Sequence, residues 1–278
     1  MTSIPSFFFD PQGLQKAGTE YKSQYAKGDP FPHIVLDHFF PDWVLEEILK
    51  EFPTPEQIHW QTYQAPMENK KLASIDETQF GNFTRHFLSQ LNSGVFLRFL
   101  EELTEIQNLI PDPYLLGGGL HQIKRGGFLK IHADFNRHSK LGLDRRLNLL
   151  IYLNKDWKEE YGGHFELWDE KMANCKKKLL PIFNRCVIFS TSRTSYHGHP
   201  EPLTCPEKQT RKSLALYYYS ASRELQVTDG IHGTLFQQRP GEAGSKGLKI
   251  RNLLLDITPP FIANAVRSIR NKKRMDSE

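Results

Sequence analysis

The sequence predicts an α+β protein with a mainly β core, because the spacing of its apolar residues changes part-way along the chain. Before residue 110, apolar residues recur at helical spacing. The clearest helical stripe consists of Val95, Phe96, Phe99, Leu100 and Leu103. From Gly117 onward the period changes to two, the runs shorten, and turn residues separate them. Several short strands at regular spacing are typical of a β-sandwich or barrel, against which the N-terminal helices would pack.

The first 110 residues are expected to support that core. Residues 11–27 have the pattern of an amphipathic helix, and residues 31–37 have that of a strand. A second helix is predicted for residues 42–52, because Pro41 suits its start and Pro53 ends it. Two more helices follow near residues 80–91 and 95–105, and their apolar stripe would pack on the back of the sheet.

Polar segments lie between and after these elements. Residues 53–74 form a long polar and aromatic connection, of the kind that serves as a lid or substrate wall. Residues 220–246 have the character of an insertion or lid, and residues 260–269 that of a last amphipathic helix before a basic tail. We therefore divide the chain into a support region (1–110), a core (111–222) and a C-terminal insertion and helix (223–278) of the same domain.

The composition is ordinary for a globular protein, with a net charge of +4. Its lysine and arginine runs, at 176–178 and 267–274, lack the interleaved aromatics of a nucleic-acid surface, so we do not expect a nucleic-acid partner. The three cysteines form no even disulfide framework. The run Phe7-Phe8-Phe9 is broken by Asp10, so no secretory leader is expected, and no stretch has the length of a membrane span. These features predict a cytoplasmic location.

A candidate metal site lies at the end of one predicted strand. Residues 126–134 have the strand pattern, so the side chains of His132 and Asp134 share a face. An imidazole and a carboxylate two residues apart can bind one metal ion from one side. A second histidine from a distant strand would complete a set of two histidines and one carboxylate, with open positions opposite it. His197 is the candidate for that second histidine.

The spacing of His132 and Asp134 is weak support by itself, because a histidine two residues before an acid occurs three times in the chain. His164-Phe165-Glu166 follows a glycine pair, and His199-Pro200-Glu201 contains a proline, which suits the interior of a strand poorly. The alternative reading of His132 is a structural, hydrogen-bonded histidine on a β-strand. Its neighbours in the sequence favour the metal site.

Those neighbouring segments follow one another in a recognisable order. The segments are Gly127-Phe128-Leu129-Lys130-Ile131-His132-Ala133-Asp134, Arg146-Leu147-Asn148-Leu149-Leu150-Ile151-Tyr152-Leu153-Asn154, Gly162-Gly163-His164-Phe165-Glu166-Leu167, Cys186-Val187-Ile188-Phe189, His197-Gly198 and Arg211-Lys212-Ser213-Leu214-Ala215-Leu216-Tyr217-Tyr218. Over about 100 residues this order resembles the iron(II)/2-oxoglutarate-dependent dioxygenases of the prolyl 4-hydroxylase type, including the hypoxia-sensing prolyl hydroxylases. The resemblance implies a double-stranded β-helix, or jelly roll, buttressed by the N-terminal helices.

The resemblance also implies a ligand set and cosubstrates. Iron(II) would be held by His132, Asp134 and His197, with 2-oxoglutarate and O2 as cosubstrates and ascorbate as a candidate reductant. His199 is the alternative to His197, because alternation puts both on one face of a strand. We favour His197, which precedes a glycine and a proline-rich exit as the family's ligand does. His199 would then stand behind the ligands, face the substrate or lie in a surface turn.

The expected cosubstrate contacts come from three strands. Arg211 matches the basic residue that pairs with the distal carboxylate of 2-oxoglutarate, and Ser213 lies on the same face. Tyr152 is the preferred hydroxyl contact and Asn148 the second choice. Ten residues before His132, where relatives commonly carry a tyrosine, this chain has Gln122, whose amide could donate instead.

The resemblance implies a hydroxylase. Related halogenases have a small residue in place of the carboxylate ligand, whereas this chain keeps Asp134. The expected reaction oxidises an unactivated C–H bond and releases succinate and CO2. Candidate substrates are a prolyl or other residue of a protein, a free amino acid, or a small metabolite or glycan. Residues 54–74, 135–145 and 220–246 would frame the entrance.

Positive side chains near that entrance have two interpretations. Asn136, Arg137 and Arg145 could attract an anionic substrate, although charges in loops commonly serve solubility. Two other functions stay open at this point. One is a jelly-roll module that binds a metal without turnover, and the other is an interaction protein whose basic tail binds an acidic partner.

Overall fold

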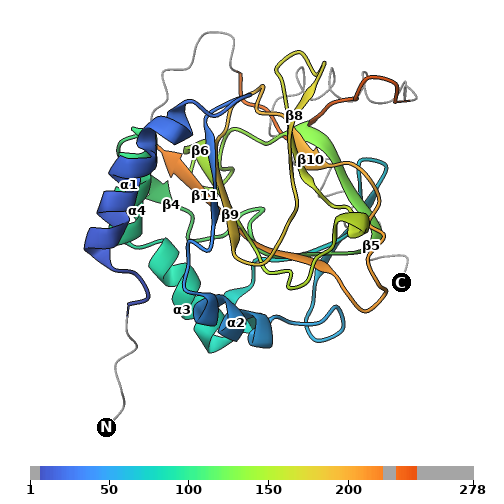
Figure 1. Cartoon of the computed structure of the whole chain (residues 1–278), viewed down its shortest axis with the longest axis horizontal. Helices are drawn as coiled ribbons and strands as arrows, with labels where there is room; N and C mark the ends of the chain where they lie inside the picture. Colours follow the sequence, from blue (N-terminus) through green and yellow to red (C-terminus); the bar gives the residue numbers. More distant parts are fainter. Residues whose placement is uncertain (1–6, 222–229, 243–278) are drawn as a thin grey trace.

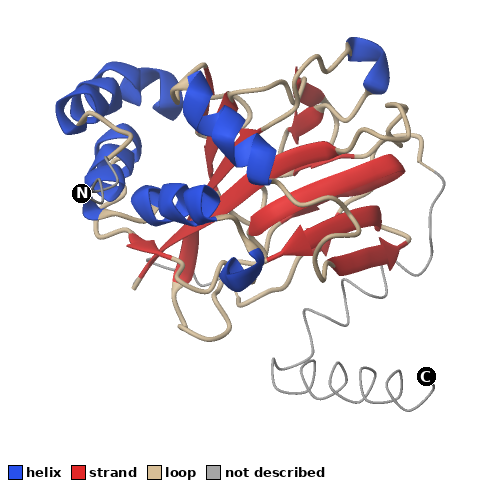
Figure 2. Ribbon diagram, turned by 90° about the horizontal axis from the view of Figure 1, so that it is seen from below, coloured by secondary structure: helices blue, strands red, loops and turns tan. Residues whose placement is uncertain are grey.

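The computed structural model describes residues 7–221 and 230–242, in which helices cover one side of a curled antiparallel sheet (Figures 1 and 2). The helices are α1 (Pro11–Ala26), α2 (Asp42–Glu51), α3 (Asn82–Leu91) and α4 (Gly94–Thr104), with two short 3-10 turns at Glu77–Gln79 and Glu159–Tyr161. All four α-helices predicted before residue 110 are present, each within two residues of its expected bounds.

The helix ends follow from local chemistry. The Asp10 carboxylate caps α1 by accepting from the backbone N–H groups of Gln12 and Gly13, and Pro11 occupies the first turn. Ser93 caps α4 through the N–H of Phe96. Helix α2 ends at Glu51, because the next residue, Phe52, precedes Pro53 and has an extended backbone. These caps fix where each apolar stripe begins and ends.

The sheet joins strands that are far apart in the sequence. In spatial order its main path is β1 (His33–Asp37), β9 (Arg185–Ser190), β6 (Asp144–Tyr152), β11 (Arg211–Ser220), β5 (Gly119–Ala133), β10 (His197–His199), β7 (Phe165–Trp168) and β8 (Cys175–Leu179). Strands β4 (Ile110–Pro111) and β12 (Leu235–Phe236) pair with β11 and β5. The strands enclose an interior that Figure 1 shows end-on, as expected for a jelly roll.

Alternate residues of the central strands are buried on opposite faces. In β6, Leu147, Leu149 and Ile151 belong to the core beneath the helices, whereas Tyr152 packs inside the curled sheet. Strand β11 repeats this, with Leu214, Leu216 and Tyr218 toward the helices and Ser213, Ala215 and Tyr217 on the other face. A strand buried on both faces has a nearly continuous apolar run, as β6 has from Leu147 to Tyr152 apart from Asn148, and β11 from Leu214 to Tyr219.

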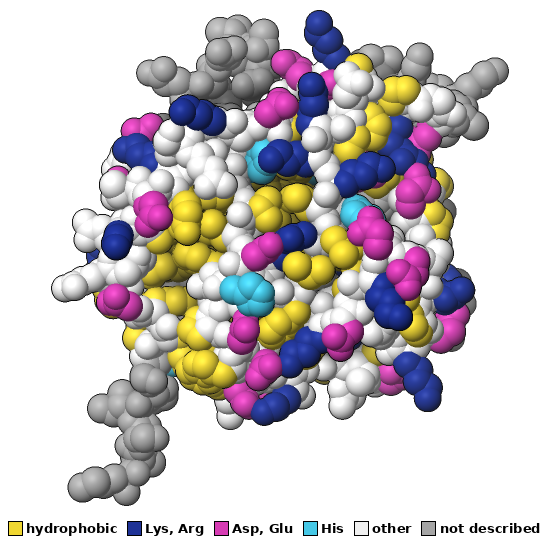
Figure 3. Space-filling model, in the orientation of Figure 1, with side chains coloured by type: hydrophobic (Ala, Val, Ile, Leu, Met, Phe, Trp, Pro, Cys, Tyr) yellow, Lys and Arg dark blue, Asp and Glu magenta, His cyan; other side chains and the backbone are white. Residues whose placement is uncertain are grey.

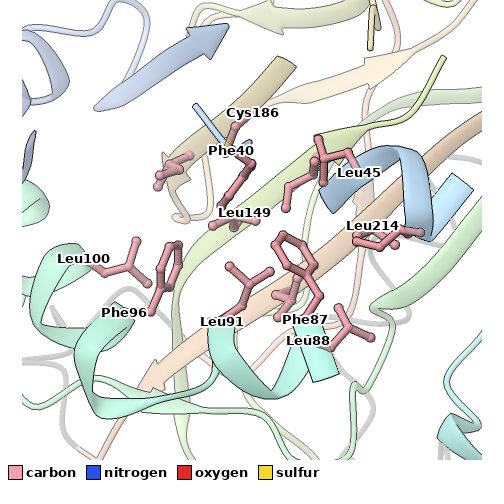
Figure 4. Close-up of a cluster of buried hydrophobic side chains, with 14 of the residues drawn as sticks. Phe40, Leu45, Phe87, Leu88, Leu91, Phe96, Leu100, Leu149, Cys186 and Leu214 are labelled. Atoms are coloured by element: carbon pink, nitrogen blue, oxygen red, sulfur yellow. The ribbon is translucent and has the colours of Figure 1, made fainter. Parts of the chain in front are cut away.

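The main core lies between helices and sheet. Figure 4 shows Phe87, Leu88 and Leu91 of α3 and Phe96 and Leu100 of α4 packed toward the sheet. Leu149, Cys186 and Leu214 meet them from β6, β9 and β11. The predicted stripe of α4 is buried at Phe96, Phe99, Leu100 and Leu103, while Val95 packs partly against it. This layer holds the back of the sheet rigid behind the interior face.

Strand β5 contains an irregularity that reverses its two faces. Opposite β3, the pairing moves from Phe128 to Ile123 while the partner moves only from Asn69 to Lys71. An odd number of extra residues inverts the inward and outward alternation. The extra residues include Gly126, whose φ of 76° favours glycine, and Gly127, where a Cβ would lie 2.5 Å from Cγ2 of Ile123.

One expectation about the connecting segments needs correction. Residues 53–74 are not a loop throughout, because β2 (Gln61–Ala65) and β3 (Glu68–Ser74) form a hairpin and β3 extends the sheet beside β5. The polar alternation of β2 concealed this strand, since most of its side chains are exposed. Within 220–246, the described part includes β12, which pairs with the metal-site end of β5. The predicted helix at 260–269 lies outside the described residues.

None of the described helices combines the length and apolar character needed to cross a membrane. Whether residues 1–110, 111–222 and 223–278 act as the three parts we expected stays a prediction.

Candidate metal centre

The structure brings His132, Asp134 and His197 together. His132 lies near the end of β5, Asp134 directly follows that strand, and His197 begins β10, where it is the pairing partner of His132. One ligand atom from each residue lies within 4.8 Å of the others. The Nε2 atoms of His132 and His197 face the Asp134 carboxylate at 3.6 and 3.3 Å. Antiparallel pairing of two distant strands therefore assembles the set that the sequence suggested.

The orientation of both imidazoles is fixed by the backbone. Nδ1 of His132 lies 2.9 Å from the carbonyl oxygen of Lys130, and Nδ1 of His197 lies 2.8 Å from that of Ser195. A carbonyl can only accept, so each Nδ1 carries the proton. Each Nε2 is then left with a lone pair directed at the centre, which is the tautomer a metal ligand needs. Burial lowers the pKa of His197, and this effect outweighs the negative charge of Asp134, which would raise it.

Asp134 is held as a carboxylate. Burial alone would raise its pKa, but the charge of Arg145 and the contacts with the two histidines outweigh it and hold that pKa well below the usual range. Oδ2 accepts from Asn148 Nδ2 at 2.7 Å and from Arg145 Nη2 at 3.1 Å. Two imidazoles with Nε2 directed at the centre and an ionised carboxylate are a donor set suited to iron(II).

Arg211 lies at the opposite end of the interior face. Its guanidinium is buried, donates from Nε to the carbonyl of Gly163 at 2.8 Å and from Nη2 to the Tyr152 hydroxyl at 3.3 Å, and stacks beside the Tyr152 ring. No carboxylate pairs with it among the described residues. A buried cation without an acid is costly, and an anionic ligand would offset the cost. Ser213 lies on the same face, paired with Tyr152.

Two histidines lie between these ends, of which His199 is buried and His121 is partly buried. Neither ring nitrogen of His199 has a hydrogen-bond partner within the described part of the chain. The same is true of Nε2 of His121. Burial, together with the charges of Arg211 and Lys71, holds the pKa of His199 well below its usual range. Burial and the charge of Lys71 lower the pKa of His121 to about 3. Both rings are neutral at physiological pH, and their unpaired nitrogens fit a polar ligand that the interior would receive.

Two expected cosubstrate residues have other roles. Gln122 lies on the opposite face of β5, where its carboxamide donates to the carbonyl of Pro53 and accepts from the Thr210 hydroxyl. The irregularity in β5 is the reason, and it places His121, opposite Ser213, on the interior face instead. Asn148 faces the interior as expected, but its carboxamide is taken up by Asp134 and Arg145. We therefore remove both from the cosubstrate contacts.

The structure also separates His197 from His199, which the sequence left as alternatives. The pairing of β10 with β5 shifts between them, so His197 faces His132 while His199 pairs with Leu129. His199 is buried and therefore not a surface turn residue.

Sequence reasoning missed Lys71 entirely, because it lies in the polar stretch we read as a loop. A positive side chain alternating with Ala73 on a strand was the available signal.

Comparisons with known proteins agree with this geometry. Residues 118–219, which contain all three candidate ligands and Arg211, match the sequence profile of the 2OG-Fe(II) oxygenase superfamily. This segment, residues 118–219, is therefore a 2OG-Fe(II) oxygenase domain. A segment of 82 residues is 30% identical to mouse prolyl 3-hydroxylase OGFOD1, covering 28% of this chain and 15% of that protein. The match thus spans a small part of that relative.

Solved structures share the fold of this oxygenase. A Trichoplax adhaerens prolyl hydroxylase, in complex with a peptide of hypoxia inducible factor, superposes with a TM-score of 0.55 at 18% identity, over 75% of this chain and 91% of that one. A Pseudomonas putida prolyl-4-hydroxylase gives 0.51 at 15% identity, over 74% and 100%. HygX from Streptomyces hygroscopicus, with nickel, 2-oxoglutarate and hygromycin B, gives 0.51 at 14%, over 79% and 96%. The jelly-roll architecture is confirmed.

Members of this superfamily use iron(II), 2-oxoglutarate and O2. The residues of this oxygenase fit those groups at both ends of the interior. His132, Asp134 and His197 supply the ligand set, and the acid-free guanidinium of Arg211 suits the distal carboxylate of a diacid.

Proposed function

We propose that this chain is a 2-oxoglutarate-dependent hydroxylase that oxidises an unactivated C–H bond with release of succinate and CO2. The observation that carries the proposal is the pairing of the two ends of the interior face. The ligand set lies at one end, and a buried arginine without an acidic partner among the described residues lies at the other. A module that only binds a metal has no need of that arginine.

The residues of the chain have distinct tasks in this proposal. His132, Asp134 and His197 would hold iron(II), which supplies the activation of O2 when bound. Arg211 and Tyr152 would hold the distal carboxylate of 2-oxoglutarate, with Ser213 beside them. The neutral rings of His121 and His199 line the space between, and the apolar cluster of Phe165, Leu167, Val187 and Phe189 excludes water from it.

The fold is compatible with two classes of substrate. A prolyl hydroxylase with a peptide and HygX with hygromycin B share this fold, so the fold alone fits a peptidyl residue and a small molecule. A prolyl or other amino-acid residue and a small metabolite are therefore both candidates. The three cysteines are free, which supports our proposal of a reducing, cytoplasmic location.

An anaerobic titration tests the reaction class. Iron(II) followed by 2-oxoglutarate should produce the weak visible charge-transfer band of a chelated cosubstrate, and admission of O2 should release succinate. Asp134→Ala and His197→Ala should abolish iron retention and the band. His164→Ala is the matched control, because His164 belongs to another His-x-Glu motif and pairs with Glu159 at the surface. Failure of the native protein to give the band would refute the proposal.

A further inference from the structure

Arg145 has one edge of its guanidinium occupied and the other vacant. Nε donates to Asn148 Oδ1 at 2.8 Å, and Nη2 donates to Asp134 Oδ2 at 3.1 Å. Nη1 is buried and makes no hydrogen bond of normal geometry within the described residues, although the nearby Tyr217 hydroxyl helps to raise the pKa of Arg145. Because the group is planar, Nη1 and the second hydrogen of Nη2 form a further edge whose geometry matches a carboxylate.

This guanidinium cannot turn to find another partner. Its central carbon lies 3.5 Å from the centre of the Tyr217 ring and 4.5 Å from that of Phe135. The stacked rings and the two hydrogen bonds hold the fork in one plane. A buried donor left without a partner is costly, so a site that keeps one in a fixed direction is suited to a ligand that completes it.

Lys71 contributes a second positive group near the interior histidines, since its charge lowers the pKa of both His121 and His199. It projects from β3 with 14% of its side chain exposed, and its ammonium lies 4.6 Å from the centre of the Tyr63 ring. Its nearest acid, Glu68, is 3.7 Å away, which is longer than a hydrogen bond. Burial lowers the pKa of Lys71, while the charges of Glu68 and Asp134 act in the opposite direction.

Among the described residues, the interior therefore has an excess of positive charge. Lys71, Arg145 and Arg211 face two acids, Asp134 and Glu68. An iron(II) dication and a 2-oxoglutarate dianion would cancel each other and leave that excess unchanged. On the face shown in Figure 3, by contrast, lysine and arginine are interspersed with aspartate and glutamate. The positive excess is thus a property of the interior and not of this surface.

We propose that the substrate of this oxygenase carries a carboxylate, which binds between the vacant edge of Arg145 and the ammonium of Lys71. This inference rests on the proposed function and adds the substrate class to it. Because the same guanidinium contacts a metal ligand, Asp134, the carboxylate binds beside the metal centre. The oxidised carbon is then close to the acid group in the substrate, as in an amino acid or an acidic side chain.

The test uses a pair of probes that differ in charge and little in shape. Propionate and propionamide are titrated into the protein loaded with zinc and saturating 2-oxoglutarate, and binding is followed by NMR saturation transfer. Zinc replaces iron so that no turnover occurs. Propionate should bind at least tenfold more tightly than propionamide, since a charge-assisted hydrogen bond is lost with the amide.

Variants assign the binding to the two cations. Lys71→Met should weaken propionate by about tenfold and leave the affinity for 2-oxoglutarate within about twofold. Lys71→Arg should restore it. Lys70→Met is the matched control, because Lys70 is the exposed neighbour that reaches the carbonyl of Arg125 instead. Arg145→Lys keeps the charge but loses the fork, and should also weaken propionate.

Three results would overturn the inference. One is equal binding of propionate and propionamide, and another is propionate affinity that Lys71→Met leaves unchanged. The third is competition of propionate with 2-oxoglutarate, which would place the acid at Arg211. In each case a normal charge-transfer band with iron(II) would leave the proposed hydroxylase standing, so the two failures are distinguishable.

A final comparison separates the two sources of such an acid. Succinate release by the iron-loaded protein is measured with N-acetyl amino acids, each against its amide, and with a capped Gly-Asp-Gly peptide against its Asn counterpart. Stimulation by the free acids alone indicates a small-molecule substrate, and stimulation by the Asp peptide alone indicates a protein. Equal stimulation by the acid and the neutral member of every pair would contradict the inference.

Discussion

The amide nitrogen of Asn148 donates a 2.7 Å hydrogen bond to Oδ2 of Asp134, and its oxygen accepts from Arg145. One side chain thus orients both the metal-binding carboxylate and the arginine beside it. Oδ2 also lies 3.3 Å from Nε2 of His197, and Oδ1 lies 3.6 Å from Nε2 of His132, so both oxygens of the oriented carboxylate face the ligand nitrogens. Residues that orient a ligand in this manner usually affect metal affinity nearly as much as the ligand itself.

Asn148→Ala should weaken iron(II) binding by roughly tenfold to a hundredfold, because Asp134 loses its shorter hydrogen bond. Metal affinity is measured anaerobically by competition with a chromophoric chelator. Asn154→Ala is a control for loss of a buried asparagine, since the side chain of Asn154 bonds to the backbone of Pro181 and Lys212 and these hydrogen bonds include no metal ligand. Equal iron affinity in the native protein and Asn148→Ala would contradict this role.

Arg211→Gln should weaken 2-oxoglutarate by about tenfold to a hundredfold, because the distal carboxylate loses a charge-assisted contact. Iron retention should remain, since Arg211 touches no metal ligand. The midpoint of the charge-transfer titration measures the effect. Lys124→Gln, a change at an exposed position of the same sheet, serves as control. A midpoint that does not move would remove Arg211 from the cosubstrate site.

His199→Leu should retain iron, in contrast to His197→Ala. The substitution also removes two buried nitrogens that have no partner in the described structure. The free energy of unfolding of the ligand-free protein should therefore change by no more than about 1 kcal/mol in either direction. Chemical denaturation and iron content provide the two measurements. Loss of iron from His199→Leu together with retention by His197→Ala would show that the ligand is His199.

Gly198→Ala should disturb the metal centre through the backbone. A Cβ at Gly198 would lie 2.8 Å from the carbonyl oxygen of Leu129 and 2.9 Å from that of Lys130, the acceptor for His132. We expect a loss of stability of about 1–3 kcal/mol and weaker iron binding, because β10 and β5 must separate. Gly233→Ala is the control, since a Cβ there meets nothing within 4 Å. Unchanged iron affinity would contradict the expected separation.

The pair Asp37 and Arg185 gives a pH-dependent stability. Two hydrogen bonds of 2.7 Å from Arg185 lower the pKa of Asp37, and they join β1 to β9. A lowered pKa stabilises the folded state above the unfolded value, near pH 4, and the gain is lost as the pH falls through the folded value.

Asp37→Asn should therefore cost about 0.5–1 kcal/mol at pH 7, a modest value because the pair is partly exposed. The difference from the native protein should shrink below about pH 4. Urea denaturation across pH measures it, with Glu46→Gln, from an exposed pair with Lys155, as control. A difference that grows on acidification would refute the assignment.

The sequence predicted the features that local periodicity controls. The helices, the two-faced strands and the convergence of His132, Asp134 and His197 follow from apolar spacing and from strand alternation. It failed where the alternation is interrupted. The change of face within β5 moved Gln122 away from the interior and His121 into it, and the polar β2–β3 hairpin hid Lys71. Neither an irregular strand nor a polar edge hairpin has a strong local pattern.

The irregularity in β5 has a consequence for the size of acid the protein accepts. The same strand carries His132 at one end and His121, opposite Ser213, at the other, with Gly126 and Gly127 between them. Because Arg211 pairs with Ile123 of β5, the extra residues between Ile123 and His132 set the distance from the Arg211 guanidinium to the metal ligands. Lengthening or shortening this stretch by one residue would turn the distal half of the strand over and change which diacid fits.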